Sequence, residues 1–487
     1  MAAPVPNIPT LIPIDEFTWE IPTSQLVGMR VPGRLFSNRA LLSQVEDDPS
    51  LQQLANVATL PGIQSNALAM PDIHFGYGFP VGGVAAFDLA EGVVSPGGIG
   101  YDINCGVRLL RTSLTVPEVR PRLRALVEAL YHEVPSGVGS KGGITLSQGE
   151  MDEVLAGGAK WVVDQGRGRA QDLTFQEEEG RMRSADPAQI SDSARKRGHR
   201  QLGTLGSGNH FLEVQAVDSI FYPEFASALG LVPDGVVVML HTGSRGLGHQ
   251  VATEFIQTMD RRLSQDGVTL VDRQLSCAPI SSEEGQRYLR AMAAGANFAW
   301  ANRQAITDGV RRAFAGVFQR SAESMDLSVV YDIAHNIAKE EVHDVAGVSK
   351  RVIVHRKGAT RAFPAGREEV PAAYRTFGQP VLIPGDMGTA SYVLAGLPTS
   401  LTRSFGSSCH GAGRRLSRHA AIRAFRFDEV TRRLSEQGII VRSATREGVT
   451  EEAPGAYKDV EEVVRVAEGA GLTRRVARLV PLGVVKG

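Results

Sequence analysis

The sequence predicts one large domain of the mixed α/β (α+β) class, with helical excursions from its core. Short apolar runs with β-strand character, such as residues 236–240, recur along the chain and lead into polar or glycine-rich turns. Longer segments with helical spacing separate these runs. No repeat at solenoid or propeller periods and no low-complexity linker divides the 487 residues. Length alone would suggest about three domains, but the undivided pattern favours a single domain over 1–487.

The first 112 residues are expected to hold a surface arm followed by strands. Residues 1–24 are rich in proline, which favours an irregular arm. Glycines become dense from 70 to 112, where short β-rich runs at 84–87 and 107–110 alternate with tight turns. This glycine-rich segment is therefore expected to open the core.

Three later segments are expected to be mainly helical. Residues 121–134 have helical spacing, and Pro121 suits a first turn because its missing N–H costs little there. Residues 165–200 are polar and charged, which favours an exposed helix or excursion. Residues 281–318 are rich in alanine and arginine and largely free of helix breakers, which predicts one or two long helices.

The C-terminal half is expected to return to the sheet. Apolar runs at 327–333, 352–354 and 381–383 predict strands, and a helix near 460–468 precedes a terminal strand at 479–487. The expected core segments are 70–112, 200–250, 327–420 and 440–487, and the mainly helical excursions are 113–199 and 251–326.

The composition is that of a soluble globular protein. Hydrophobic residues make up 43% of the chain and charged residues 22%. The net charge of -1 means that nucleic-acid binding would need a local basic patch. Three cysteines are too few for a disulfide framework and suit a reducing compartment. The sequence has neither a signal-peptide pattern nor an apolar run long enough to span a bilayer, so we expect a cytoplasmic protein.

A first candidate metal motif is the glycine-rich turn at 97–106. Asp102 and Cys105 lie three residues apart within it. A carboxylate and a thiol this close could share a metal ion, which favours the deprotonated thiol. The alternative is a buried structural cysteine beside an aspartate in a turn.

A second motif combines Asn209, His210 and Glu213. In a strand, His210 would face one side with Leu212, and Asn209 and Glu213 would face the other side with Phe211. His210 could then bind a metal while the opposite face binds another group. The alternative is a core histidine whose hydrogen bonds are satisfied.

Two further histidines end β-like runs. His241 follows the run at 236–240 and precedes a glycine-rich turn with Arg245 that suits phosphate, and His335 follows the run at 329–334. The chain has no Gly-x-x-x-x-Gly-Lys-Ser/Thr pattern, which disfavours a P-loop NTPase. Together with Asp102 and Cys105, the three histidines predict a centre for one or two metal ions, and this mixed ligand set suits zinc, iron or manganese.

The turn around His410 is the candidate nucleophile site. His410 precedes glycines and then Arg414, Arg415 and Arg418. A histidine can attack phosphorus when cations hold the phosphates, and arginine pairs well with phosphate. One alternative is a helix N-terminus with a solvated basic face. Cys409 is the other possible nucleophile, which is disfavoured because no base partner is evident in the sequence.

A basic segment at 355–361 contains His355, Arg356, Lys357 and Arg361. We expect a loop after a strand, suited to RNA phosphates or a nucleotide. The alternative is an ordinary exposed loop, which is the commoner meaning of a run of charges.

Five of these motifs together resemble the RtcB family of RNA ligases. The matching segments are 95–108, 206–211, 241–248, 355–361 and 410–414. They occur in the family's order, and the resemblance spans residues 70–487, so it implies a single RtcB-type domain. It also implies an enzyme that joins RNA ends bearing a 2′,3′-cyclic phosphate or 3′-phosphate to ends bearing a 5′-hydroxyl, in tRNA splicing or RNA repair.

The resemblance further implies a mechanism with GTP and two manganese ions. His410 would attack the α-phosphorus of GTP, and the guanylate would pass to the RNA 3′-phosphate before the 5′-hydroxyl attacks. One manganese would be held by Cys105, His210 and His241, and the other by Asp102, Cys105 and His335. Asp72 and His74 match family positions near the active centre, without a role assigned to them.

The resemblance also implies the contacts to guanylate and RNA. Glu213 would accept from guanine N1 and N2, Lys486 would donate to O6 or N7, and Tyr457 would stack on the ring. The full set of expected guanylate contacts is Asn209, His210, Phe211, Leu212, Glu213, His335, Asn336, Pro384, Gly385, Asp386, Met387, Ser391, His410, Gly411, Ala412, Gly413, Tyr457 and Lys486. RNA is expected on Lys357, Arg361, Arg414 and Arg418.

Two other functions fit parts of the sequence. A metal-dependent phosphoesterase that opens RNA cyclic phosphates would need the metal ligands but not the His410 turn or Lys486. A non-enzymatic RNA-binding protein would need only the basic segments and would leave the Asp/Cys/His set unexplained. The expected partners are RNA (tRNA halves or cleaved RNA) and GTP, with archease as the activator known in this family, and no membrane.

Overall fold

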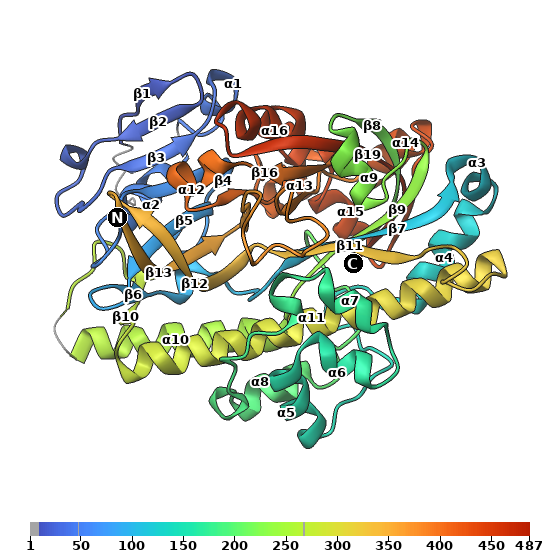
Figure 1. The fold of residues 1–487 in the computed structure, drawn as a ribbon, viewed down its shortest axis with the longest axis horizontal. Helices are drawn as coiled ribbons and strands as arrows, with labels where there is room; N and C mark the ends of the chain where they lie inside the picture. Colours follow the sequence, from blue (N-terminus) through green and yellow to red (C-terminus); the bar gives the residue numbers. More distant parts are fainter. Residues whose placement is uncertain (1–8, 47, 266–267) are drawn as a thin grey trace.

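The computed structural model describes residues 9–46, 48–265 and 268–487, and two large sheets form the core of these ranges (Figure 1). The seven strands of the first sheet are, in spatial order, β1 (Ile12–Asp15), β2 (Thr18–Ile21), β3 (Gly33–Phe36), β4 (Ala67–His74), β5 (Val81–Asp88), β13 (Val348–Lys357) and β12 (Asn336–Val345). The second sheet, of eight strands, has the order β11 (Ser328–Ala334), β7 (Gly106–Thr115), β9 (Gly235–Thr242), β8 (Phe211–Ile220), β19 (Thr473–Lys486), β16 (Ser391–Gly396) and β15 (Pro380–Ile383), with β18 (Ile440–Ser443) beside β19.

Most neighbouring strands pair antiparallel, and two small ladders complete the strands. The pairs β3–β4 and β18–β19 are parallel. The two small ladders are β6 (Val93–Val94) with β10 (Ala278–Pro279) and β14 (Ala359–Arg361) with β17 (Ser407–Cys409).

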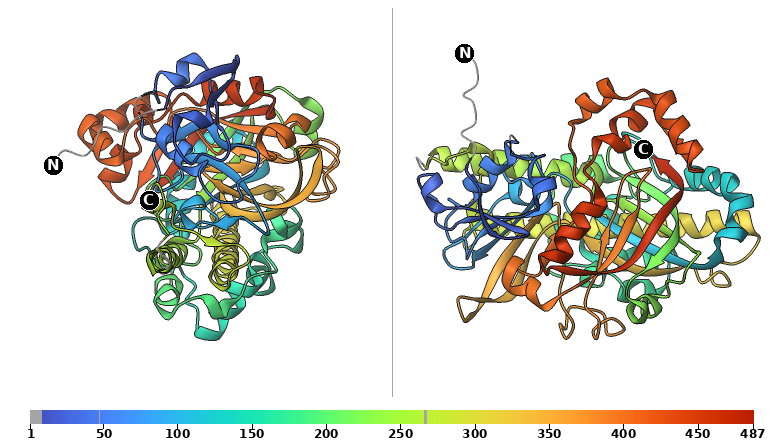
Figure 2. Two further views of the ribbon diagram at one scale, coloured as in Figure 1. Left: turned by 90° about the vertical axis from the view of Figure 1, so that its left-hand side faces the viewer. Right: turned by 90° about the horizontal axis from the view of Figure 1, so that it is seen from above.

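Two long helices separate the sheets from a group of short helices. The long helices are α10 (Arg245–Gln265) and α11 (Glu283–Phe318), and the short ones beyond them are α5 (Gln148–Gly157), α6 (Ala159–Asp164) and α8 (Asp192–Gly198) (Figures 1 and 2). Another short helix, α7 (Ala170–Thr174), contacts α6. The remaining α-helices are α1 (Arg39–Leu42), α2 (Ser50–Val57), α3 (Val116–Val119), α4 (Leu123–Glu133), α9 (Pro223–Leu229), α12 (Pro398–Ser404), α13 (Arg418–Ala424), α14 (Phe427–Glu436), α15 (Arg446–Glu451) and α16 (Val460–Gly469). Among the described residues, no helix is both long and apolar enough to cross a membrane.

The mixed α/β class is confirmed, and the long helix expected within 281–318 is one helix, α11. Its start is fixed by the Ser282 side chain, which accepts a hydrogen bond from Gly285 N. The numerical division into core and excursions stays a prediction.

The prediction of an irregular arm over 1–24 is wrong for residues 9–24, which are the part that the structure describes. Residues 1–8 lie outside the described residues, but β1 and β2 pair with each other, and β2 continues the sheet through β3. Trp19 lies opposite Leu35 in that ladder. Proline is tolerated here because Pro13 lies on β1, the edge strand, where its missing N–H breaks no central ladder.

Candidate functional site

Four adjacent strands bring the predicted metal ligands to one edge of the second sheet. In the order β11–β7–β9–β8, neighbouring strands run antiparallel, so the ends of β11 and β9 lie beside the starts of β7 and β8. His335 follows β11, Cys105 precedes β7, and His210 precedes β8. His241, near the end of β9, lies opposite Phe211. The recurring strand-end histidines in the sequence therefore meet in space.

The ligand atoms of these residues converge on the Cys105 sulfur. Cys105 Sγ lies 3.2 Å from His241 Nε2 and 3.5 Å from His210 Nε2. His241 Nε2 lies 3.2 Å from His335 Nε2, and His210 Nε2 lies 2.9 Å from Asp102 Oδ2. Each nitrogen presents its lone pair or its proton toward the same small volume.

The ligand atoms form two sets that share Cys105, with all ligand atoms of a set within 4.8 Å of one another: Cys105 with His241 and His335, and Cys105 with Asp102 and His210. His335 faces His241 at the edge of the sheet, and His210 turns toward the carboxylate of Asp102. Ligands of two ions that share one thiolate lie close together in any grouping. The expected grouping, His210 with His241 on one ion and Asp102 with His335 on the other, therefore stays a prediction.

The protonation of the cluster fits a pair of divalent cations. Burial lowers the pKa of His241 and of His335 well below the usual value, so both rings are neutral and have a lone pair to donate. Burial, followed by the Asp102 carboxylate, raises the pKa of the Cys105 thiol, so this sulfur needs a cation to become a thiolate. Imidazole, thiolate and carboxylate donors around one shared sulfur suit transition-metal ions.

His410 presents one ring nitrogen to the cavity because Asp72 holds the other. Asp72 Oδ2 accepts from His410 Nδ1 at 2.7 Å, from His410 N at 2.9 Å and from Gly411 N at 3.2 Å. Burial alone would raise the pKa of Asp72, but the His410 ring and these hydrogen bonds lower it, so Asp72 is ionised. With its proton on Nδ1, His410 keeps a free lone pair on Nε2, the nitrogen that a nucleophile needs.

Two residues hold the backbone that carries Asp72. Lys458, which is 3% exposed, donates from Nζ to the carbonyls of Pro71 and Ile73 on either side of Asp72. His74 contacts Asp72 O through Nδ1 at 3.0 Å, and burial lowers the pKa of His74 to about 3. The sequence left Asp72 and His74 without a role and gave no signal for Lys458, whose contacts cross more than 380 residues of the chain.

If His410 receives a guanylate, as the family resemblance implies, we expect Asp72→Asn to slow this transfer by about 10²–10⁴-fold, the range seen when the carboxylate that orients a catalytic histidine is removed. The amide can still accept from the two backbone N–H groups, but it lacks the charge that holds the proton on Nδ1. Rapid-quench measurement of guanylate incorporation gives the rate. A rate within threefold of wild type at every pH from 6 to 9 would contradict this role.

One cavity of about 250 Å³ joins the metal ligands to the turn of His410. Asp102, Cys105, His241 and His335 line it together with His410. Fifteen of the expected guanylate contacts line the cavity, namely Asn209, Phe211, Glu213, His335, Asn336, Pro384, Gly385, Asp386, Met387, His410, Gly411, Ala412, Gly413, Tyr457 and Lys486.

Three expected guanylate contacts do not line this cavity. Leu212 is fully buried in the core on the opposite face of β8, as strand alternation requires. Ser391 is 1% exposed, and its hydroxyl accepts from Gln215 Nε2 and Gly385 N. His210 faces Asp102 and Cys105 instead. Leu212 and Ser391 therefore pack behind the residues that line the cavity and do not themselves face it.

One wall of the cavity carries an unsatisfied carboxylate. Glu213 Oε1 is buried without a hydrogen-bond partner among the described residues, while Oε2 accepts from Gln215 Nε2 at 3.1 Å. Burial raises the pKa of Glu213 to about 8, and the nearby Asp386 adds to this. A buried acceptor with no partner indicates that a ligand with N–H donors completes the site.

Glu452, which the sequence did not indicate, contacts three side chains of the opposite wall. Its carboxylate lies 3.0 Å from Arg414 Nη1 and 3.7 Å from Lys486 Nζ, and it also accepts from the Tyr457 hydroxyl. The Arg414 guanidinium lies 5.1 Å from the centre of the Tyr457 ring. Lys486 at the end of the chain is thus held in the cavity by an ion pair, and it is 3% exposed.

The basic segment at 355–361 is not a loop, which corrects the expectation. Residues 355–357 end β13 and residues 359–361 form β14. His355 and Arg356 are fully buried, and Arg356 pairs with Glu341. Lys357 lines the cavity, and burial lowers its pKa to about 7.

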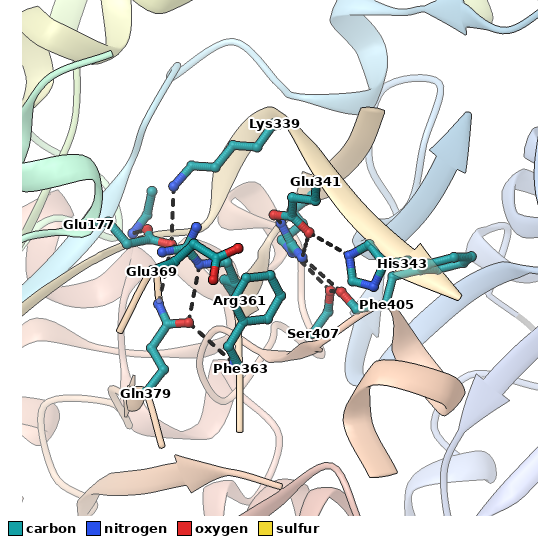
Figure 3. A network of polar contacts seen from close by, with 12 residues as sticks. Glu177, Lys339, Glu341, His343, Arg361, Phe363, Glu369, Gln379, Phe405 and Ser407 are labelled. Atoms are coloured by element: carbon teal, nitrogen blue, oxygen red, sulfur yellow. Dashed lines mark hydrogen bonds and ion pairs between the residues drawn. The ribbon is translucent and has the colours of Figure 1, made fainter. Parts of the chain in front are cut away.

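Arg361 cannot serve as an RNA contact in this structure. It is 2% exposed and lies 3.2 Å from Glu177 and 3.0 Å from Glu178, with Gln379 accepting from its Nε (Figure 3). The two glutamates come from the polar excursion at 165–200, which packs back onto the sheet. Of the other expected RNA contacts, Arg414 and Arg418 both line the cavity, and half of the Arg418 side chain is exposed.

Comparison with known proteins gives one consistent result. A family model described as "tRNA-splicing ligase RtcB" matches residues 53–487. A protein of Thermococcus kodakarensis is 58% identical over 474 residues, covering 97% of this chain and 98% of the relative. A Methanococcus maripaludis protein is 51% identical over 478 residues (98% and 99%), and an Archaeoglobus fulgidus protein 53% over 474 residues (97% and 98%). All three relatives are named tRNA-splicing ligase RtcB.

Proposed function

Because the chain belongs to the RtcB family of tRNA-splicing ligases, we propose that it joins RNA ends, in tRNA splicing or RNA repair, through a covalent guanylate on His410. The observation that carries this proposal is the hydrogen bond from His410 Nδ1 to the buried Asp72, which leaves Nε2 free in the cavity of the metal ligands. Metal-binding histidines are often held by a carboxylate in the same way, but His410 belongs to neither set of candidate metal ligands among the described residues, so its free Nε2 is available as a nucleophile.

The first step is nucleotide transfer to the protein. His410 Nε2 attacks the α-phosphorus of GTP, a P–N bond forms, and the P–O bond to pyrophosphate breaks. Asp72 holds the Nδ1 proton throughout and stabilises the positive charge that the ring acquires. Manganese ions held by Asp102, Cys105, His210, His241 and His335 would, when bound, neutralise charge on the phosphate oxygens.

The later steps return His410 to its starting state. An oxygen of the RNA 3′-phosphate attacks the guanylate phosphorus and the P–N bond breaks. The 5′-hydroxyl of the second strand then attacks the 3′-phosphorus and GMP leaves. A 2′,3′-cyclic phosphate is opened to the 3′-phosphate beforehand. Lys357, Arg414 and Arg418 line the cavity and are our proposed contacts to the RNA phosphates.

The two walls of the cavity support a preference for guanine. Glu213 Oε1 lacks a partner and can accept from guanine N1–H and N2–H, while Lys486 can donate to O6 or N7. Adenine would present an acceptor at N1 and an amine at C6, so it would offer Glu213 neither guanine donor and Lys486 no O6 acceptor. Tyr457, beside Arg414, is positioned to contact the base.

We expect the affinity for guanine nucleotides to fall as pH drops below about 8. Glu213 has a pKa of about 8 in the empty site and must lose its proton to accept both guanine donors, so binding releases a proton below this pH. The loss should approach tenfold per pH unit. Calorimetric titration with GMP between pH 6.5 and 9, in buffers of different ionisation enthalpy, measures the released protons. Glu213→Gln is the matched control, and an identical proton release in both proteins would contradict the assignment.

Intact-protein mass after incubation with GTP and manganese tests the proposed function. We expect a gain of one acid-labile guanylate. Absence of the adduct in a protein shown to hold manganese would instead favour a phosphoesterase that opens cyclic phosphates, and turnover of such an RNA without GTP would establish it. Archease as an activator and a cytoplasmic location belong to the same proposal.

A further inference from the structure

Aromatic rings extend from the cavity to the surface on the side of Asp102. The Tyr101 and His249 rings stack with centres 4.8 Å apart and an angle of 23° between their planes. Tyr77 meets Tyr101 edge-on at 5.5 Å. Tyr101 lines the cavity, and His249 on α10 is exposed. These rings therefore connect the metal ligands to solvent, and none of them is among the expected guanylate contacts.

A basic turn at the end of α8 reaches these rings through Arg197, whose charge acts on His249. Lys196, Arg197 and Arg200 are all exposed there. Arg197 donates to the side chain of Gln250, the residue after His249, at 2.9 Å. The turn is fixed to the start of α10 because Gly246 N donates to the Gln201 side chain, and α8 packs along α10 (Figure 1).

The charges of this turn are not neutralised by the protein. Within the described ranges, Lys196, Arg197 and Arg200 form no ion pair, whereas Arg195 in the same helix pairs with Asp152 at 2.6 Å. In a chain with a net charge of -1, three cations without an ion pair on one turn, with Arg197 at the stacked rings, are a local departure from the average surface.

We propose that Tyr101, His249, Lys196, Arg197 and Arg200, the basic–aromatic ledge, bind the single-stranded RNA next to the end that is joined. Aromatic rings stack with unpaired bases of any sequence, and adjacent cations neutralise the phosphates. This inference rests on the proposed function and adds a subsite outside the cavity. It also supplies surface contacts that Arg361, being buried, cannot make.

The charges around the ledge indicate the path of the bound RNA. On the side of Tyr77 lie the carboxylates of Asp260 and Asp272, and Arg273 pairs with Asp260 at 2.8 Å. The phosphates are repelled there and attracted on the side of α8. The RNA is therefore expected to leave the cavity over Tyr101 and His249 toward Lys196, Arg197 and Arg200.

Fluorescence anisotropy on the full-length enzyme tests the ledge. The probes are a single-stranded RNA with a 3′-phosphate and a 5′ label, and a second RNA with a 5′-hydroxyl and a 3′ label. We expect His249→Ala to weaken binding of one probe by about tenfold, the effect of losing a stacked ring. Arg197→Gln combined with Arg200→Gln should weaken the same probe and reduce its salt slope by about 1.4, at about 0.7 per phosphate.

Arg124→Gln on α4 is the matched control, because this exposed arginine lies away from α8 (Figure 1). The probe that responds identifies which RNA end the ledge holds. If both ledge variants bind both probes as the Arg124→Gln protein does, the ledge is not an RNA subsite. Guanylate incorporation from GTP alone involves no RNA and is measured in parallel. Its absence in wild type would contradict the proposed function, while the binding data would still decide the ledge.

Discussion

His410→Ala is expected to eliminate the guanylate adduct and to lower RNA ligation by on the order of 10³-fold or more, because removing a covalent nucleophile takes away the step on which the others depend. The His410 ring donates from Nδ1 to Asp72 Oδ2 at 2.7 Å, which fixes the proton on Nδ1. Intact-protein mass and a gel-based ligation assay measure the two losses. Ligation at an undiminished rate would show that guanylate does not pass through His410.

The control for this experiment separates the nucleophile from its surroundings. The five candidate metal ligands do not include His410, so the variant is expected to hold manganese as wild type does, as measured by elemental analysis. Cys409→Ser tests the other candidate nucleophile. Cys409 is fully buried, and burial raises the pKa of its thiol well above the usual value, so we expect this variant to keep its activity.

Cys105→Ala is expected to weaken binding of both metal ions by more than about 100-fold, since loss of a partner outside the ligand shell already costs about 10–100-fold. The reason is that Cys105 belongs to both ligand sets. By contrast, His335→Ala should weaken one ion and His210→Ala the other. Manganese titration followed by electron paramagnetic resonance counts the ions that remain.

The pairs of variants decide between the two groupings of ligands. If His241 and His335 hold the same ion, as the distance between their ligand atoms would allow, double substitution of these two should cost no more than one tight ion. If substitution of His210 and His241 together removes a single ion, the grouping expected from the family resemblance is right. Each variant needs a circular-dichroism check, because the four strands meet at these side chains.

Local patterns were enough to indicate the chemistry of the site. Cys105, His210, His241 and His335 each adjoin a short apolar run, and a strand end is a place where a side chain leaves the sheet toward a ligand. His410 stood out because glycines and arginines flank it. Each of these signals lies within a few residues of the cysteine or histidine concerned, so a short sequence window contains it.

The failures share a physical cause, which is burial by distant parts of the chain. Arg361 carries the same charge in any sequence window, but Glu177 and Glu178 from a remote excursion cover it. The strands at 12–21 followed from pairing with β3, which overrides the proline-rich composition.

The sequence by itself indicated which residues could bind metal and attack phosphorus, and only its resemblance to a known family indicated which could hold guanine. Only the tertiary structure decided that the five candidate metal ligands meet around Cys105 and that Asp72 fixes the proton of His410. It also decided that Lys458 holds the backbone on either side of Asp72 and that Glu452 pairs with Arg414. Those decisions depend on distances between segments hundreds of residues apart, and on the low dielectric that burial creates around charges. The periodicity and composition of a sequence contain neither these distances nor the extent of burial.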